Sequence, residues 1–341
     1  MTTGPKALLD EPARFRVDAL DRAQLAAAWG IDATSSDVAD PIRAYAELDP
    51  DHTLAQRCRA VLDDVEAQAS DAGLPPVLLI GSPTGSGWVN SAALTAVEAW
   101  TRGRCASIAL QYGALRSQAS VRALPIAARS IAALVTEASQ RIDAAGRSDG
   151  TTIVIWAESL GAWALLTALA EAPELLDLSC AVHVIWVGVP GPALADPRLR
   201  AALDARADIT TYGATGDALD ACALSPDRSD ILLTHSDDPV AHLPGPSLVW
   251  RPQAHTVPTA IPAGTRLYRR RWMPLITALR ARRTLDRVTR PPSPTLLRGV
   301  HDYRYAAASA LRACLSLPRS DLPVVQRLIA QRAASVLDRA A

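Results

Sequence analysis

Short apolar runs alternate with longer amphipathic stretches along most of this chain. Stretches of helical period occupy residues 54–72, 91–102, 119–145, 160–172 and 198–206. The apolar runs between and beside them have the length and flanking turn residues of buried strands: 42–46, 77–80, 106–111, 152–156, 182–187 and 231–234, with a weaker run at 294–297. Because strands separated by helices form βαβ units, the pattern predicts an α/β fold with a doubly wound, mostly parallel sheet.

The predicted sheet begins only after residue 40. Residues 1–40 are polar and rich in alanine, and they contain one helical stretch, 20–29, that ends at Gly30. We interpret them as a partly helical N-terminal extension, and residues 41–341 as the α/β domain.

Two connections are longer than the architecture needs, at about residues 190–229 and 241–293. The second carries many prolines and an arginine-rich stretch, 266–290. Long connections at the strand ends of an open sheet tend to cover the functional site, so we expect these two to be lid or cap segments.

The composition narrows the class of protein. With 49% hydrophobic residues and 35 basic against 35 acidic residues, the chain is neither disordered nor suited to nucleic-acid binding by bulk positive charge. The five cysteines are far apart and form no C-x-x-C pair, which is typical of buried thiols in a reducing compartment and predicts a cytoplasmic protein. No secretory signal, membrane-spanning stretch, metal-ligand spacing or cofactor motif stands out, so we expect no membrane span, metal or cofactor.

The sharpest local motif surrounds Ser159. An apolar strand leads into a five-residue turn in which the small residues Ala157 and Gly161 flank the serine, and an amphipathic helix follows. This arrangement is typical of a nucleophile elbow, although Ala157 stands where the usual pattern has glycine. The alternative for a serine at a helix start is a simple N-cap.

An acid and a base follow Ser159 in the chain order that an α/β-hydrolase triad uses. Asp238 lies in the carboxylate-containing segment that follows the run at 231–234, with Asp237 as the alternative acid, and His301 lies in a glycine-containing turn after the run at 294–297. Other histidines lie with or soon after the acid and are weaker candidates: His235, His242 and His255.

The loop at residues 81–88 contains three glycines but lacks the Gly-Lys-Ser/Thr of a phosphate loop. It lies two predicted strands before the elbow, where hydrolases place an oxyanion-hole amide. We therefore expect Leu160, Thr84 and Gly85 to supply the oxyanion hole. The predicted substrate pocket is lined by Trp88, Tyr112 and Pro190.

Seven sequence blocks occur in one order over about residues 40–310: 40–45, 82–89, 111–112, 158–161, 186–190, 236–240 and 301–303. Together they resemble an actinobacterial α/β-hydrolase family whose members are usually membrane-associated and whose substrate is unknown. The resemblance implies Ser159 as nucleophile, with Asp238 and His301 completing the triad. Two departures are Ala157 in place of glycine and an N-terminal region without the membrane-spanning pattern typical of that family.

These observations predict a serine hydrolase that cleaves an ester or thioester through an acyl-enzyme. Transfer of the acyl group to a nucleophile other than water, by an acyltransferase or cyclase, stays open. A lyase or isomerase that uses His301 as base, or a non-catalytic binding protein on the same fold, also stays open. The expected partner is a small acyl substrate. The arginines of 266–290 could recognise a phosphate-bearing acyl carrier or a membrane surface, and the simpler interpretation is a solvated helix face.

Overall fold

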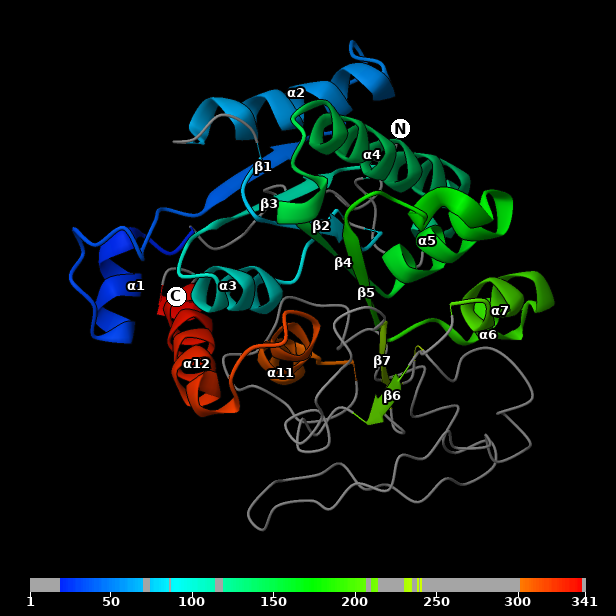
Figure 1. The fold of residues 1–341 in the computed structure, drawn as a ribbon. Helices are drawn as coiled ribbons and strands as arrows, with labels where there is room; N and C mark the ends of the chain where they lie inside the picture. Colours follow the sequence, from blue (N-terminus) through cyan, green and yellow to red (C-terminus); the bar gives the residue numbers. More distant parts are fainter. Residues whose placement is uncertain are drawn as a thin grey trace, which may run out of the picture.

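The strands in the described part of the chain all belong to one parallel sheet (Figure 1). The structure is a computed structural model that describes residues 19–69, 74–85, 87–113, 119–206, 210–213, 230–234, 238, 240 and 301–338. The strand order is β1-β3-β2-β4-β5-β7-β6, and every neighbouring pair is parallel. The strands are β1 (Ile42–Ala46), β2 (Val77–Ser82), β3 (Cys105–Leu110), β4 (Thr152–Glu158), β5 (Ala181–Val187), β6 (Thr210–Gly213) and β7 (Ile231–Thr234).

Helices cover both faces of this sheet. One face carries α2 (Leu54–Gln68), α4 (Leu124–Ala144) and α5 (Leu160–Glu171), and the other carries α1 (Arg22–Trp29), α3 (Ser91–Trp100), α11 (Arg304–Cys314) and α12 (Leu322–Asp338) (Figure 1). The shorter helices are α6 (Gly191–Ala195), α7 (Pro197–Asp204), and the 3₁₀ turns η1 (Ala119–Ala123), η2 (Ser148–Gly150), η3 (Pro173–Leu176) and η5 (Arg319–Asp321). The predicted doubly wound parallel sheet is confirmed.

The alternation of side chains along β4 explains why its sequence is continuously apolar. Ile153, Ile155 and Ala157 pack into the core under α4 and α5. Val154 and Trp156 point the other way, into the core under α3 and α11. Because successive side chains of a strand face opposite sides, a central strand between two helix layers is buried at every position.

The predicted strand bounds agree with the structure to within two residues, and the runs 42–46 and 231–234 agree at both ends. The strand β6 was missed, and it lies within the segment 190–229 that was predicted as a lid. The described part of that segment supplies α6, α7 and an edge strand of the sheet, and its role as a lid stays a prediction. The second predicted lid, 241–293, and the weak run at 294–297 lie outside the described residues.

Residues 19–40 pack against the second helix layer. The helix α1 ends at Gly30, as its sequence predicted, and this glycine adopts the left-handed conformation. Leu25 and Val38 are fully buried in the core that contains α3, and the Leu20 amide donates a hydrogen bond to Glu98 Oε2 (3.0 Å). The division of the chain at residue 40 stays a prediction.

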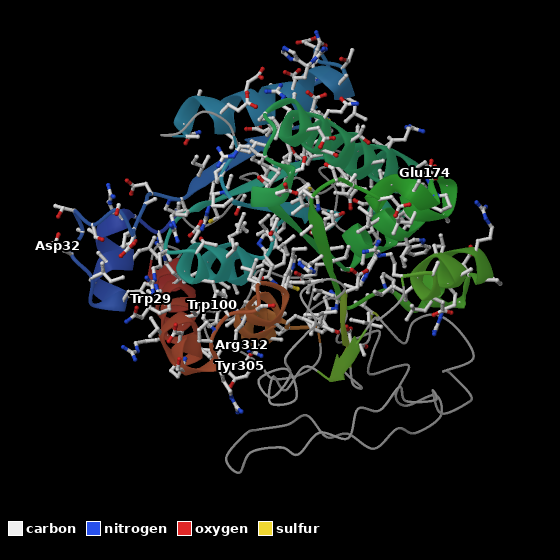
Figure 2. The ribbon with its side chains drawn as sticks, in the orientation of Figure 1. Trp29, Asp32, Trp100, Glu174, Tyr305 and Arg312 are labelled. Atoms are coloured by element: carbon white, nitrogen blue, oxygen red, sulfur yellow. The ribbon has the colours of Figure 1, made fainter. Side chains whose placement is uncertain are left out.

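The helices α11 and α12, which sequence periodicity did not single out, complete this layer. Trp100 at the end of α3 lies beside them (Figure 2), and its indole N–H donates to the carbonyl of Ala308 in α11 (2.8 Å). Among the helices in the described part of the chain, none is both long and apolar enough to cross a membrane.

Candidate active site

Ser159 connects β4 to α5 in a strained backbone conformation. Its φ of 55° and ψ of −118° are rare for a residue with a side chain. Its amide donates to the carbonyl of Val187 at the end of β5 (2.8 Å), and its side chain forms no capping hydrogen bond to α5. The structure therefore does not use Ser159 as a conventional helix cap, which removes the simplest alternative to a nucleophile elbow.

Gly161 allows the first turn of α5 to approach the end of β2. A Cβ atom at this position would lie 2.0 Å from the carbonyl oxygen of Ser82 and 2.9 Å from that of Pro83. The Ser82 hydroxyl in turn donates to the Gly161 carbonyl (2.9 Å). Ala157, which replaces the other glycine of the pattern, is fully buried in the α4–α5 core, where its methyl group is accommodated.

Asp238 and His301 form a hydrogen-bonded pair. His301 Nδ1 lies 2.8 Å from Asp238 Oδ2, and the same oxygen accepts a hydrogen bond from the Tyr303 hydroxyl (2.6 Å). Asp238 Oδ1 accepts the amide of Val240 (2.8 Å), and the carboxyl group is fully buried. The competing acid Asp237 and the competing histidines His235, His242 and His255 lie outside the described residues.

The charges of this pair stabilise each other. Burial alone would raise the pKa of Asp238, but the neighbouring His301 and the hydrogen bonds from His301, Tyr303 and Val240 lower it below its usual value. Burial alone would lower the pKa of His301, but the carboxylates around it, Asp238 first, raise it. The site therefore favours an imidazole that accepts a proton while Asp238 stays ionised.

Gly188 links the pair to the serine. It follows Val187, the residue that binds the Ser159 amide, and its φ is 52°. A Cβ atom on Gly188 would lie 2.7 Å from His301 Cε1 and 2.8 Å from Tyr303 Cε2. Ser159 and His301 therefore border the same end of β5, at the carboxyl edge of the sheet where ligands of open α/β sheets bind.

Gly188 and Tyr303 were not among the predicted site residues. Both fall inside sequence blocks that carried the family resemblance, 186–190 and 301–303. A glycine directly after a strand and an aromatic residue two positions after a histidine are ordinary features of a sequence. Only the tertiary contacts show their part in the site: Tyr303 donates to Asp238 and packs edge-to-face on His301 (5.6 Å), and Gly188 leaves room for both rings.

The predicted oxyanion donors lie around the first turn of α5. Leu160 is the first residue of that helix, where free amides and the positive end of the helix dipole favour negative charge. The amide of Thr84 already donates to the Trp88 carbonyl (3.0 Å), so the Thr84 main chain is committed to the loop. Gly85 lies in the same loop, where its carbonyl accepts the Ser120 hydroxyl (2.8 Å).

The predicted pocket residues have different environments. Tyr112 is buried in an apolar cluster with Leu160 and Leu124, and its hydroxyl donates to the Pro83 carbonyl (3.1 Å). Burial raises the pKa of Tyr112, so it remains a neutral donor. Trp88 is half-buried in the loop after β2, and Pro190 is buried at the start of α6.

The cysteines of the described residues are unsuited to nucleophilic chemistry. Cys58, Cys105, Cys180 and Cys314 are buried free thiols. Burial raises the pKa of Cys58 to about 11 and that of Cys105 to about 12, which disfavours the reactive thiolate. Within the same described ranges, no group of three or more His, Cys, Asp and Glu side chains is arranged to hold a metal ion.

A parallel sheet with a strained serine after β4 and an Asp–His pair at its carboxyl edge defines a protein of α/β-hydrolase type. Residues 42–212 match the Alpha/beta-hydrolase family, over half of the 341-residue chain, and the chain belongs to this family. Membership supports a hydrolase-fold enzyme in general. Comparison with curated proteins and with solved structures gave no match. The matched range includes Ser159 and ends before Asp238 and His301. The assignment of these two residues to the site depends on their hydrogen bond and their place in the structure.

Proposed function

We propose that this protein is a serine hydrolase that cleaves an ester or thioester through an acyl-enzyme on Ser159. The observation that carries the proposal is the 2.8 Å contact between His301 Nδ1 and the buried Asp238 carboxylate, at the strand edge that also holds the strained Ser159. A hydrogen bond to Nδ1 orients the imidazole and leaves its Nε2 to act on the nucleophile.

The first half of the reaction forms the acyl-enzyme. Ser159 Oγ attacks the acyl carbonyl carbon as its proton passes to His301 Nε2, and the carbonyl π electrons move onto the oxygen. The amides of Leu160 and Gly85 stabilise this oxyanion. The tetrahedral intermediate then collapses, and His301 donates its proton to the departing alcohol or thiol.

The second half returns the enzyme to its starting state. A water molecule gives a proton to His301 and attacks the acyl-enzyme carbonyl, and collapse releases the carboxylic acid as Ser159 recovers its proton. Asp238 stays ionised throughout and stabilises the imidazolium. The lowered pKa of Asp238 and the raised pKa of His301 match these roles.

Intact-mass measurement after incubation with a fluorophosphonate tests the proposal. The wild-type protein should gain one adduct, and Ser159→Ala should gain none. Ser179→Ala removes an exposed serine that hydrogen-bonds to Ser148 (3.1 Å), and this control should label like the wild type. An adduct that persists in Ser159→Ala, or folded wild-type protein that does not label, would contradict the proposal.

Asp238→Asn tests the identity of the acid. Replacing the triad acid by its amide lowers activity by about 10⁴-fold in a well-studied serine protease, so a loss on the order of 10³–10⁴ in the labelling rate is expected here. Asp237→Asn is the matched control and should label at nearly the wild-type rate. The reverse result would move the assignment to Asp237.

A further inference from the structure

Glu158 is a buried carboxylate directly before Ser159. It is the last residue of β4, only 4% of its surface is exposed, and it lies opposite Val187 in the register with β5. Side-chain alternation places it on the same face of the sheet as Trp156, toward α3 and α11. The turn that carries His301 and Tyr303 leads into α11 on this face, where Tyr303 shares a core with Trp156.

Two neutral donors hold the Glu158 carboxylate in place. Asn90 Nδ2 and Trp156 Nε1 each donate to Oε2 at 2.9 Å. Asn90 is itself fixed, because its Oδ1 accepts the Ala92 amide (3.0 Å) as the cap of α3. Within the described part of the chain, no lysine or arginine forms an ion pair with Glu158. A buried carboxylate without a fixed cation is costly unless another charge compensates it.

The fold brings His301 to the strand end that carries Glu158, because Val187 lies opposite Glu158 and a Cβ on the next residue, Gly188, would lie 2.7 Å from His301 Cε1. Burial raises the pKa of Glu158, and interaction with His301 is the largest of the opposing influences. Three carboxylates act on His301: Asp238, Glu158 and Asp302. The Asp302 carboxylate is bound by the Arg304 guanidinium (2.8 and 2.7 Å), which offsets its charge. Of these three carboxylates, Asp238 and Glu158 have no guanidinium partner within the described part of the chain.

We propose that Glu158 is a positioning residue of the active site, whose buried carboxylate lies within electrostatic reach of His301 and stabilises the imidazolium formed when His301 takes the Ser159 proton. This inference rests on the proposed function. The Glu158 side chain acts on the reaction only through His301. A residue that merely held Asn90 and Trp156 would need an acceptor oxygen but no charge, and a glutamine would supply that oxygen at a lower cost of burial.

Glu158→Gln separates these two roles. The glutamine has nearly the same shape, and its amide oxygen can accept both hydrogen bonds, so the substitution removes chiefly the charge. The measurement is the second-order rate constant for phosphonylation of Ser159 by a fluorophosphonate, followed by intact mass from about pH 5 to about pH 9. We expect the apparent pKa of the rate profile to fall by about one unit and the plateau rate to fall about five-fold.

Asp230→Asn is the matched control. Asp230 is another buried carboxylate, 3% exposed, that accepts an indole N–H, from Trp186 at 3.2 Å. Its charge is compensated by Arg206 (2.8 Å) rather than by His301. Its replacement should lower stability and leave the apparent pKa of the labelling profile at the wild-type value.

Trp156→Phe is the second variant. It keeps an aromatic ring in the core and removes one of the two donors to Glu158 Oε2, so it disfavours the ionised carboxylate. It should move the profile in the same direction as Glu158→Gln by a smaller amount, and it provides the test if Glu158→Gln does not fold.

The results that would overturn the role of Glu158 differ from those that would overturn the proposed function. A profile of either folded variant that superimposes on the wild type overturns the role of Glu158, even while Ser159 still labels. If the wild type does not label, or Ser159→Ala labels equally, the proposed function fails, and the role of Glu158 fails with it.

Discussion

Gly188→Ala is the sharpest test of the site geometry. The substitution adds one methyl group at the end of β5, and its Cβ would lie 2.7 Å from His301 Cε1 and 3.0 Å from His301 Nδ1. The same Cβ would lie 2.8 Å from Tyr303 Cε2. Tyr303 is only 1% exposed and is hydrogen-bonded to Asp238, so its ring has little room to move. One of the two rings, or the strand end, must therefore move.

The magnitude follows from these distances. Carbon atoms in contact prefer about 3.5–4.0 Å, so the His301 ring must shift by roughly 1 Å relative to Ser159. A misplacement of about 1 Å can cost about 100-fold in rate. The positive φ of 52° adds a backbone cost of roughly 1–2 kcal/mol for any residue with a Cβ. We expect labelling by a fluorophosphonate to slow about 100-fold.

Gly146→Ala is the matched control for the backbone cost. Gly146 has a φ of 64°, and a Cβ there would meet nothing within 4 Å. Urea unfolding should show a loss of roughly 1–2 kcal/mol for Gly146→Ala, with wild-type labelling, and a larger loss for Gly188→Ala. Wild-type labelling by Gly188→Ala would refute the placement of His301 against the end of β5.

Four further predictions concern the same site. Tyr303→Phe removes the hydroxyl that donates to Asp238 (2.6 Å). It should slow labelling about ten-fold and lower the unfolding free energy by about 1–2 kcal/mol. An unchanged labelling rate would contradict the role of Tyr303 in holding Asp238. Gly161→Ala places a methyl group 2.0 Å from the Ser82 carbonyl oxygen and should lower the free energy of unfolding in urea by about 3 kcal/mol. An unchanged free energy of unfolding would argue against the close approach of α5 to the end of β2. The labelling rate should rise with pH through an apparent pKa above about 6.5, because neutral His301 is the base and its pKa is raised; a midpoint below that value would contradict the arrangement. Thermal unfolding followed against pH should show two contributions to stability. That of Asp238, whose pKa is lowered by folding, should be present above about pH 3.9 and lost as the pH falls through its folded pKa. That of His301, whose pKa is raised by folding, should be present below about pH 6.5 and lost as the pH rises through its folded pKa.

The central strands β2, β3, β4 and β5, which sequence analysis found, are buried on both faces along most of their length. The residues of β4 are apolar almost throughout because helices cover both sides of the sheet, so the run is visible without any structure. The edge strand β6, with the sequence TTYG, is short and lacks such a run. Among the described strands it pairs with β7 alone, and its place in the sheet depends on that partner rather than on its own pattern.

The sequence by itself determined the order of the helices and strands from β1 to β5 and the turn at Ser159, because these depend on the spacing of apolar residues and on a small residue such as Gly161 at the turn. Only the tertiary structure decided which groups meet at the end of β5. Asp238 and His301 are 63 positions apart, and their contact depends on how distant segments pack. The same holds for Gly188, whose missing side chain leaves the space that the His301 and Tyr303 rings occupy. Such contacts leave no periodic trace in a sequence, since they are formed by side chains from segments far apart along the chain.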